Sequence, residues 1–246
     1  MENGKMPERI ARITPGEPFS FRCHPQISCF TDCCRHLELA LTPYDVLRLR
    51  QATKCSSAEL HEKYLIREQT AEDVFPHFYL TMVDDGRSSC AFVTSSGCSI
   101  YEHRPSACRT YPLGRAAIRR ENDIDIFYVL LQEPHCHGFH EPTIQTATSF
   151  CRSQELETYN HFNDLIIAIQ QHEKIRQGMR LTRKEADAYS LALYDIDTFR
   201  KRLKDGTIET YNLIDKPEQL DNDEELLRIS VSWLKIKLFG ESGEDT

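Results

Sequence analysis

The chain has 246 residues, of which 40% are apolar and 28% charged, ordinary values for a folded protein with a buried core. Its 38 acidic and 30 basic side chains give a formal net charge of −8, which argues against a general binder of nucleic acids or anionic membranes. No stretch approaches the ~18 consecutive apolar residues of a membrane helix, and the polar N-terminal segment is unlike a secretory signal. We therefore expect a cytoplasmic protein that binds neither membrane nor nucleic acid.

Cysteine is the most unusual part of the composition. The chain has ten cysteines, eight of which lie between Cys23 and Cys108. In a reducing cytoplasm this density is more typical of metal binding or catalysis than of a disulfide framework. The adjacent cysteines Cys33 and Cys34 also rarely bridge each other, because the resulting eight-membered ring strains the peptide bond between them.

Two helices are predicted early in the chain from their starting signals. In "LTPYDVLRL", Thr42 can cap the free amide groups, Pro43 fits the first turn and Asp45 places a negative charge at the positive end of the helix dipole. In "SSAELHEKYL", Ser56 and Glu59 have the spacing of a capping box. Both segments are therefore expected to be helical.

Two β-hairpins are predicted next. The order "FYLTMV", "DDGR", "SSCAFV" is typical of a strand, a turn and a strand. The segment "LGRAAIRRENDIDIFYVLL" predicts a second hairpin that turns near Glu121 to Asp123. Residues 1 to about 140 are therefore expected to form a cysteine-rich part made of loops and strands.

After Pro142 the apolar residues recur with the period of a helix. "LTRKEADAYSLALYDI" opens with Thr182 and Glu185 as another capping box, and "NDEELLRISVSWLKIKLFG" predicts a terminal helix that ends at Gly240. The tail "ESGEDT" is expected to be disordered. The first of these helices, within "QELETYNHFNDLIIAIQQHEKI", should place one apolar stripe on a core: Leu156, Tyr159, Phe162, Ile166 and Ile169.

These elements predict an α+β fold with two parts. Residues 1–142 are expected to form a small cysteine-rich, metal-organised domain with short β-hairpins and helices. Residues 143–246 are expected to form a helical C-terminal region that packs on it. No internal repeat and no Gly-rich or Pro-rich linker separates the two parts.

The cysteines of the first part form two clusters and one outlier. The first cluster has the pattern C-x5-C-x3-C-C and the second the pattern C-x7-C-x9-C. Cys136 follows in the loop "EPHCHGFHEP". Short loops with thiols suit a thiophilic metal, because they bring sulfur atoms within about 4 Å of one another and the ion offsets their repulsion.

The adjacent pair Cys33 and Cys34 raises a question of geometry. Consecutive side chains point in different directions, so the two thiols cannot easily serve one ion together. They are better placed to reach two metals, or one metal and a neighbouring site. Two four-thiolate sites and one compact cluster both remain open, since spacing alone does not choose between them.

Three arginines, Arg104, Arg109 and Arg115, lie close in sequence to the second cluster. Guanidinium groups near thiolates would reduce the excess negative charge of an all-cysteine site, which is about −2 for zinc with four thiolates. The alternative is an ordinary solvated or salt-bridged role for these side chains.

The stretches "FRCHPQISCFTDCC", "CAF" and "CSIYEHRPSACRTYP" resemble the YkgJ-type cysteine cluster proteins, described as having a zinc- or iron-chelating domain. The resemblance covers roughly residues 19 to 140. Bacterial flagellin lysine N-methylases resemble the same domain. The resemblance implies metal ligands at the following positions: Cys23, Cys29, Cys33, Cys34, Cys90, Cys98, Cys108 and Cys136.

Other candidate ligands are less favoured. Cys55 and Cys151 have no counterpart in the family and are expected to be small packed side chains within or beside helices. Histidine is a common metal ligand, and four histidines lie close to candidate cysteines in the sequence: His36, His135, His137 and His140.

We therefore expect a metal-binding protein whose cysteine cluster ligates zinc or an iron–sulfur cluster, with an unidentified protein as a candidate partner. The alternatives are a protein-modifying enzyme resembling the lysine N-methylases and a redox protein that uses the cluster. The chain has no G-x-G-x-x-G after a strand, no Walker loop and no C-x3-C-x2-C triplet, and these absences weigh against the enzyme interpretation.

Overall fold

The computed structural model describes residues 9–120 and 123–241. Helices make up 44% of the described residues and strands 19%, which confirms the predicted α+β class. Part of the turn predicted near Glu121 and nearly all of the tail predicted to be disordered lie outside the described residues. Among the described helices, none combines the length and the apolar composition that crossing a bilayer requires.

Contacts along the chain define two compact units. Unit 1 comprises Met1–Leu39 and Leu80–His161, and unit 2 comprises Ala40–Tyr79 and Phe162–Thr246. Every predicted metal ligand belongs to unit 1. The predicted domain boundary after residue 142 stays a prediction. The two units are not divided at one point in the sequence, because the segment 40–79 groups with the C-terminal helices.

Unit 1 is built from short strands and short helices. Its strands are β1 (Arg9–Ile13), β2 (Pro18–Ser20), β5 (Met82–Val83), β6 (Ser89–Cys90), β7 (Val93–Thr94), β8 (Gly97–Cys98), β9 (Leu113–Arg119), β10 (Ile124–Gln132) and β11 (Ile144–Thr146). Its helices are α3 (Ser106–Thr110), α4 (Ala147–Ser153) and the 3₁₀ helices η1 (Asp32–Cys34), η2 (Tyr101–His103) and η3 (His137–His140).

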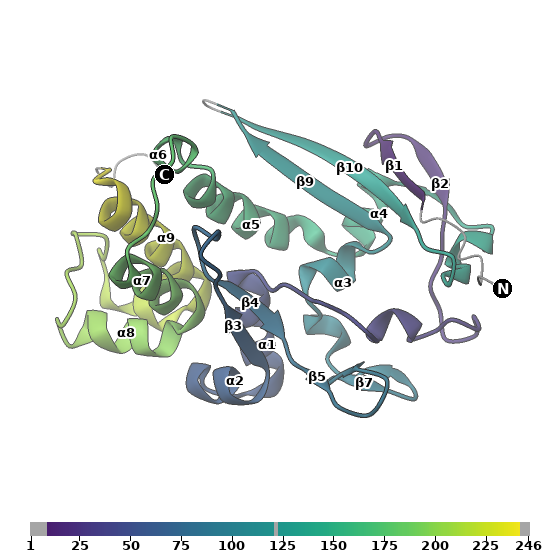
Figure 1. Cartoon of the computed structure of the whole chain (residues 1–246), viewed down its shortest axis with the longest axis horizontal. Helices are drawn as coiled ribbons and strands as arrows, with labels where there is room; N and C mark the ends of the chain where they lie inside the picture. Colours follow the sequence, from purple (N-terminus) through teal and green to yellow (C-terminus); the bar gives the residue numbers. More distant parts are fainter. Residues whose placement is uncertain (1–8, 121–122, 242–246) are drawn as a thin grey trace. The chain divides into compact units, whose positions relative to one another are not determined.

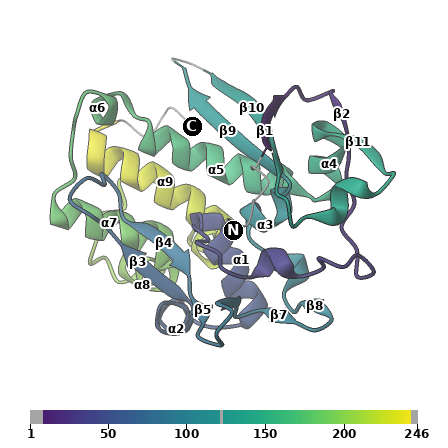
Figure 2. The ribbon, with the colours of Figure 1, turned by 45° about the vertical axis from the view of Figure 1, so that its right-hand side comes forward.

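A three-stranded antiparallel sheet, in the order β1-β10-β9, supports unit 1 (Figure 2). The register pairs Leu130 with Leu113 and Ile124 with Arg119, which confirms the second predicted hairpin. Strand β2 pairs separately with β11. One buried cluster joins the large sheet to this second pair and to α4: Ile13, Phe19, Phe21, Leu113, Leu130, Ala147 and Phe150.

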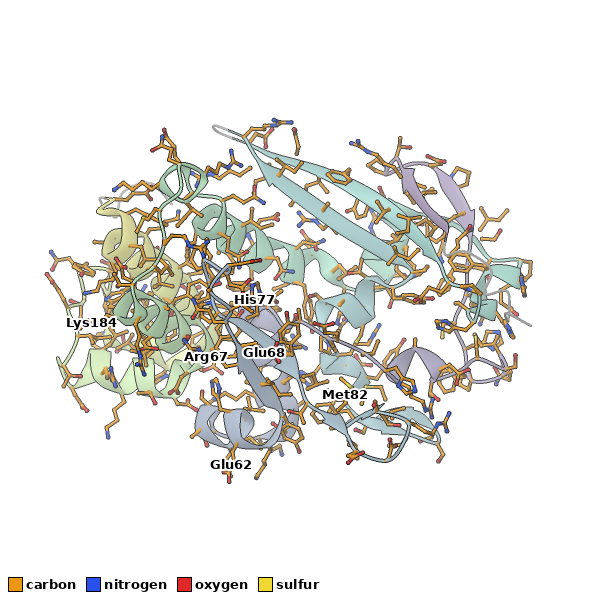
Figure 3. All side chains as sticks on the ribbon, viewed as in Figure 1. Glu62, Arg67, Glu68, His77, Met82 and Lys184 are labelled. Atoms are coloured by element: carbon orange, nitrogen blue, oxygen red, sulfur yellow. The ribbon has the colours of Figure 1, made fainter. Side chains whose placement is uncertain are left out.

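The first predicted hairpin is shorter than the apolar run suggested. Strands β5 and β6 pair antiparallel, and Met82, labelled in Figure 3, lies opposite Cys90. The first part of the run "FYLTMV" belongs instead to β4 (His77–Leu80), which pairs with β3 (Leu65–Glu68). The continuous run is divided because its two ends find different partner strands.

Unit 2 is mainly helical. Figure 1 shows α7, α8 and α9 packed side by side. The helix α5 (Leu156–Gln170) begins in unit 1 and ends in unit 2. The other helices of unit 2 are α1 (Pro43–Thr53), α2 (Ser57–Lys63), α6 (Glu173–Arg176), α7 (Arg183–Tyr194), α8 (Ile196–Lys204), the 3₁₀ helix η4 (Pro217–Asp221) and α9 (Asp223–Phe239).

The helices begin and end at the predicted signals. Both residues of the predicted capping boxes exchange hydrogen bonds at the starts of α2 and α7. The predicted cap Thr42 at the start of α1 also forms a capping box, with Asp45. Helix α9 ends at Gly240, whose φ of 71° is a left-handed conformation that glycine adopts without strain. The predicted stripe of α5 is buried along its whole length: Leu156, Tyr159, Phe162, Ile166 and Ile169.

Aromatic stacking organises the core of unit 2. The rings of Tyr44 and Phe162 stack with centroids 4.5 Å apart, and those of Phe78 and Tyr194 with centroids 3.8 Å apart. Trp233, the only tryptophan of the chain, meets Phe199 edge to face. This core needs no metal to hold it together, since each of these side chains has a buried apolar partner.

The capping box of α7 gives a test of the helical unit. The Thr182 hydroxyl accepts a hydrogen bond from the Glu185 amide at 3.3 Å and donates to the Glu185 carboxylate at 2.7 Å. Thr182→Ala should therefore lower the free energy of unfolding by about 1 kcal/mol. Thr182→Ser keeps the hydroxyl and should unfold like the natural protein in a urea titration followed by Trp233 fluorescence. Equal losses for both variants would contradict the role of the cap.

Candidate metal centre

The loop that carries Cys136 is held against the segment that carries the first cysteines. The amide of Arg22 donates a hydrogen bond to the carbonyl of Gly138 at 3.0 Å. The amide of His137 donates to the Cys29 sulfur at 3.1 Å. Cys23 and Cys29 are thus brought to Cys136 across more than a hundred residues of sequence.

Gly138 is required for this close approach. A Cβ atom added there would lie 2.7 Å from Cε2 of Phe21 and 3.0 Å from the carbonyl oxygen of Arg22. Both distances are shorter than van der Waals contact, and the second involves backbone that cannot rotate away. The absence of a side chain at Gly138 therefore lets the two segments meet.

A second set of contacts brings Cys34 to Cys90. Arg35, directly after Cys34, forms an isolated antiparallel bridge with Ser89, directly before Cys90. The amide of His36 donates to the carbonyl of Ser88 at 3.0 Å. The end of the first cysteine cluster thus lies beside the start of the second.

The hairpin β7–β8 carries Cys98 into the same region. In this pair Cys98 lies opposite Val93, and Val93 is three residues after Cys90. Gly97 has a φ of 119°, and a Cβ atom there would lie 3.2 Å from the ring of Phe30. The hairpin therefore packs on the residue that follows Cys29, and only glycine allows both the backbone conformation and the contact.

Cys108 lies on α3, and Arg109 fixes the backbone around that helix. The guanidinium donates to the carbonyl oxygens of Gln154 at 2.7 Å, Glu102 at 2.5 Å and Arg104 at 3.3 Å. The side chain is only 3% exposed and also covers the ring of Tyr159. Arg109 thus ties η2, α3 and the end of α4 together rather than facing the thiols.

Arg104 has neighbours of two kinds, side chains at η2 and at the end of α4 and the candidate thiols. Its guanidinium stacks on the Tyr101 ring at 3.7 Å and donates to the Gln154 side chain at 2.5 Å. Its positive charge interacts with the thiols of Cys23, Cys98 and Cys108. Arg115, the third arginine near the second cluster in sequence, lies instead beside Cys151 and Tyr128.

The thiols are close enough to influence one another's protonation. Cys23 and Cys33 are exposed to solvent. Partial burial nevertheless raises the pKa of Cys23 to about 11, and negative charge on Cys33, Cys136 and Cys29 adds to the rise. A hydrogen bond from the Cys34 thiol lowers the pKa of Cys33 and raises that of Cys34. Cys34 also interacts with Cys108 and Cys90.

Burial likewise raises the pKa of Cys90, Cys98 and Cys136, and charge on Cys33 adds to each rise. If these thiols lost their protons together, the negative charges on their sulfur atoms would repel one another. A bound cation offsets that repulsion, so the donor chemistry fits a thiophilic metal.

Tyr111 supplies a second sign of fit. Its buried hydroxyl makes no hydrogen bond of normal geometry within the described residues, yet it lies beside the Cys136 thiol and the Glu133 carboxylate. Burial, followed by these two neighbours, raises the pKa of Tyr111, so the hydroxyl keeps its proton. A thiolate at Cys136 would accept a hydrogen bond from that O–H, as metal ligands commonly do from the groups around them.

The ten cysteines are all free. Within residues 9–120 and 123–241, no group of three or more His, Cys, Asp or Glu side chains already surrounds a point that an ion could occupy. The structure thus brings together the segments that carry the eight candidate ligands, and the ligand set itself stays a prediction.

The remaining candidates lie elsewhere or have other partners. Cys151, on α4, packs against the buried cluster of unit 1, in keeping with the small packed side chain expected there. Cys55 belongs to unit 2, whereas all the candidate ligands belong to unit 1. His137 shares a hydrogen bond of 2.6 Å with the Ser28 hydroxyl.

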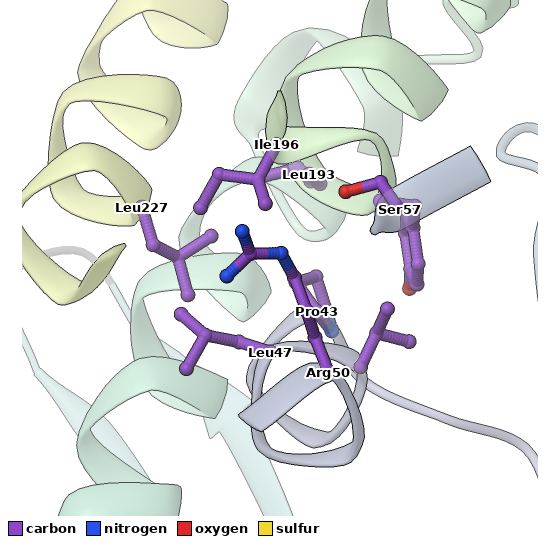
Figure 4. A pocket seen from close by; sticks show the side chains of 9 residues that line it. Pro43, Leu47, Arg50, Ser57, Leu193, Ile196 and Leu227 are labelled. Carbon is purple, nitrogen blue, oxygen red and sulfur yellow. The ribbon is translucent and has the colours of Figure 1, made fainter. Parts of the chain in front are cut away.

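Unit 2 and unit 1 each contain a hollow. The one in unit 2, drawn in Figure 4 and lined by Arg50, Ser57 and apolar side chains of α1, α7 and α9, encloses about 10 Å³, which is scarcely room for one water. A larger open groove of about 420 Å³ in unit 1 is lined by Arg35, Arg87, Asp85 and Cys90 among others. The second hollow therefore borders the cysteine region.

Residues 22–152 match a family model described as "CxxCxxCC: Putative zinc- or iron-chelating domain". The chain belongs to this family. The match covers more than half of the chain, contains all eight candidate ligands and confirms the predicted resemblance. No curated protein and no solved structure matches the chain. The family supports metal binding and leaves the identity of the metal open.

The contact at Gly138 can be tested by adding one methyl group. Gly138→Ala should lower the free energy of unfolding by about 1–3 kcal/mol, because the new Cβ meets the Arg22 carbonyl. Gly16→Ala is the matched control, since no atom lies within 4 Å of a Cβ at that position. We expect it to change stability by no more than about 1 kcal/mol in urea unfolding followed by circular dichroism. Equal stability of the two variants would show that the close approach is unimportant.

The role of Arg109 gives another prediction. Arg109→Lys keeps the charge but cannot donate to three carbonyl groups from one planar fork, so unfolding should become easier by about 2–4 kcal/mol. Arg152→Lys changes an exposed arginine on the neighbouring helix α4 and should alter stability by about 0.5 kcal/mol at most. The same urea titration compares the two. A wild-type midpoint for Arg109→Lys would contradict the structural role.

Proposed function

We propose that this chain is a metal-binding protein whose cysteines ligate zinc or an iron–sulfur cluster. The observation that carries the proposal is the convergence of three segments, around residues 21–36, 88–108 and 136–138, on one region with all their thiols free. The proposed ligands are Cys23, Cys29, Cys33, Cys34, Cys90, Cys98, Cys108 and Cys136.

The build of unit 1 supports this proposal. Strands β5, β6, β7 and β8 have two residues each, too few to be stable by pairing alone. The buried cluster of unit 1 involves β1, β2, β9, β10 and α4 but none of these four strands. A metal bound by these cysteines would stabilise the region from β5 to α3, which contributes no strand to that buried cluster.

The residues around the thiols would keep a metal centre in place. Arg104 would reduce the excess negative charge, and the Tyr111 hydroxyl would donate to the Cys136 thiolate. The amide of His137 already donates to the Cys29 sulfur. When bound, zinc would supply a redox-silent crosslink, whereas an iron–sulfur cluster would supply a site for electron transfer.

The other two interpretations of the sequence stay predictions. An enzyme resembling the lysine N-methylases requires a pocket for a methyl donor and a peptide, and the groove beside Cys90 is the place to look for one. A redox protein requires a cluster that can be reduced and reoxidised. The gathering of the thiols suits a redox protein as well as a structural metal site, and no described contact beyond it favours either interpretation.

The proposal is tested by metal analysis of the full chain after anaerobic purification. We expect at least one zinc ion, or iron together with labile sulfide, for each chain. A variant with Cys23, Cys29, Cys33 and Cys34 all changed to serine should lose nearly all of it, whereas Cys55→Ser should keep the full amount. Absorption separates the metals, because zinc leaves the protein colourless and an iron–sulfur cluster makes it brown.

Two results would contradict the proposal. One is a natural protein with no more metal than the fourfold variant, after growth with both zinc and iron supplied. The other is an equal loss of metal in Cys55→Ser, which would mean that the binding does not depend on the gathered cysteines. Bleaching of the brown colour by dithionite and its return in air would favour the redox interpretation over a purely structural cluster.

A further inference from the structure

The open groove of about 420 Å³ in unit 1 combines positive charge with apolar surface. Strands β5 and β7, which both contribute to its lining, lie next to each other in Figures 1 and 2. We propose that this groove binds a carboxylate that adjoins an apolar group, as in a small organic acid or in an acidic segment of a peptide. Its volume is typical of ligand sites. This inference goes beyond the proposed metal binding and does not depend on it.

Arg35, which lines the groove, is held in place by its backbone and by one end of its guanidinium. Its backbone forms a bridge with Ser89, another residue of the lining. Its Nη1 donates to the carbonyl oxygen of Thr31 at 2.7 Å and to the Thr31 hydroxyl at 3.3 Å. Only 18% of the side chain is exposed. The guanidinium is therefore ordered before a ligand arrives, so little of its conformational freedom remains to be lost on binding.

The other edge of this guanidinium has donors without partners. The Nε of Arg35 is buried and makes no hydrogen bond within the described residues. The bonds that the guanidinium makes to described residues all start from Nη1 and go to Thr31 and Asp32. Nε–H and one N–H of Nη2 point in parallel, which is the arrangement that binds the two oxygens of an oxyanion. Such a ligand would supply the acceptor that the buried Nε lacks.

The charges of the lining favour a ligand with a single negative charge. Arg35 and Arg87 are its two cations and Asp85 is its one carboxylate, which leaves an excess of one positive charge. Asp85 accepts hydrogen bonds from the amides of Arg87 at 2.9 Å and Ser89 at 3.3 Å. Asp32, outside the lining, lies 3.5 Å from Arg35 and offsets part of its charge. A carboxylate therefore complements the groove better than a doubly charged phosphate does.

Apolar side chains in the same lining define the rest of the ligand. Val83, Ala91 and Val93 line the groove together with the two arginines. Val83 is 46% exposed, and covering a valine side chain is favourable. Carbon atoms next to the carboxylate would provide that cover. A strongly hydrated inorganic anion would not, so the groove should favour an organic acid over an anion such as sulfate.

The first test compares butyrate with butyramide, a neutral analogue of nearly the same shape. Binding of each to the full chain, purified anaerobically with its metal, is measured by saturation-transfer NMR on the ligand. Butyrate should bind about tenfold more tightly or better, because charge-assisted hydrogen bonds form only with the carboxylate. The proposal is wrong if butyrate shows no saturable binding or if the two compounds bind equally. This comparison needs no substitution in the protein.

Three variants then locate the site. Arg35→Lys keeps the charge but loses the paired donors, so butyrate should bind about tenfold more weakly or worse. Arg87→Gln removes an exposed charge and should weaken binding about two- to fivefold. Arg152→Gln changes an exposed arginine on α4 outside the lining and should bind like the natural protein.

The urea midpoint and metal content of each variant show whether a loss of binding comes from a loss of the fold or of the metal. If Arg35→Lys does not fold, Arg87→Gln decides, since its side chain is exposed. Unchanged butyrate binding in both groove variants would rule out the site. That result would leave the proposed function intact, because metal content is measured separately.

A peptide distinguishes the two sources of the carboxylate. The blocked tripeptide acetyl-Val-Glu-Val-amide presents one carboxylate between apolar side chains, and its Gln counterpart removes the charge. Tighter binding of the Glu peptide than of butyrate identifies an acidic segment of a partner protein as the ligand. Weaker binding of the Glu peptide identifies a small organic acid. Equal binding of the Glu and Gln peptides, both tighter than butyrate, would contradict recognition of a carboxylate.

Discussion

Backbone hydrogen bonds to the segment 21–36 are the constraint on which the arrangement of the cysteines depends. At one end of this segment the Arg22 amide and the Cys29 sulfur bind the loop after β10, and at the other end the His36 amide binds the residue before β6. These contacts join parts of the chain that lie fifty to more than one hundred residues apart. Apolar contacts of Phe21 with Phe139 and of Phe30 with the β7–β8 hairpin accompany these hydrogen bonds.

Electrostatics and packing act in opposite directions in this region. Burial and mutual proximity raise the pKa of most of the gathered thiols, which keeps them protonated and uncharged. Metal ligation requires them deprotonated, so affinity depends on groups that stabilise negative sulfur. The guanidinium of Arg104, the hydroxyl of Tyr111 and the amide of His137 are such groups, and they lie directly after η2, directly after α3 and in η3.

Local signals were predictable and long-range ones were not. The starts of α1, α2 and α7 followed from pairs of residues three apart, because a capping box involves only neighbouring side chains and amides. The sequence could not show that "FYLTMV" would be divided between two partner strands, or that the segment 40–79 would group with the C-terminal helices. It could not separate Arg104 from Arg109 either, since the difference lies in carbonyl groups of Gln154 and Glu102 that only folding brings near. The candidate ligands came from the resemblance to a known family, whereas the contacts that bring their segments together appear only in the fold.

The wide separation of the cysteines along the chain bears on how the protein is made. About one hundred residues lie between Cys34 and Cys136, so at ~5–20 residues per second a ribosome needs about 5–20 s to synthesise the rest of the set. During that interval the nascent chain contains the cysteines up to Cys34 but not yet Cys136. A metal centre that uses Cys136 could therefore be completed only after the loop that follows the β9–β10 hairpin has left the ribosome.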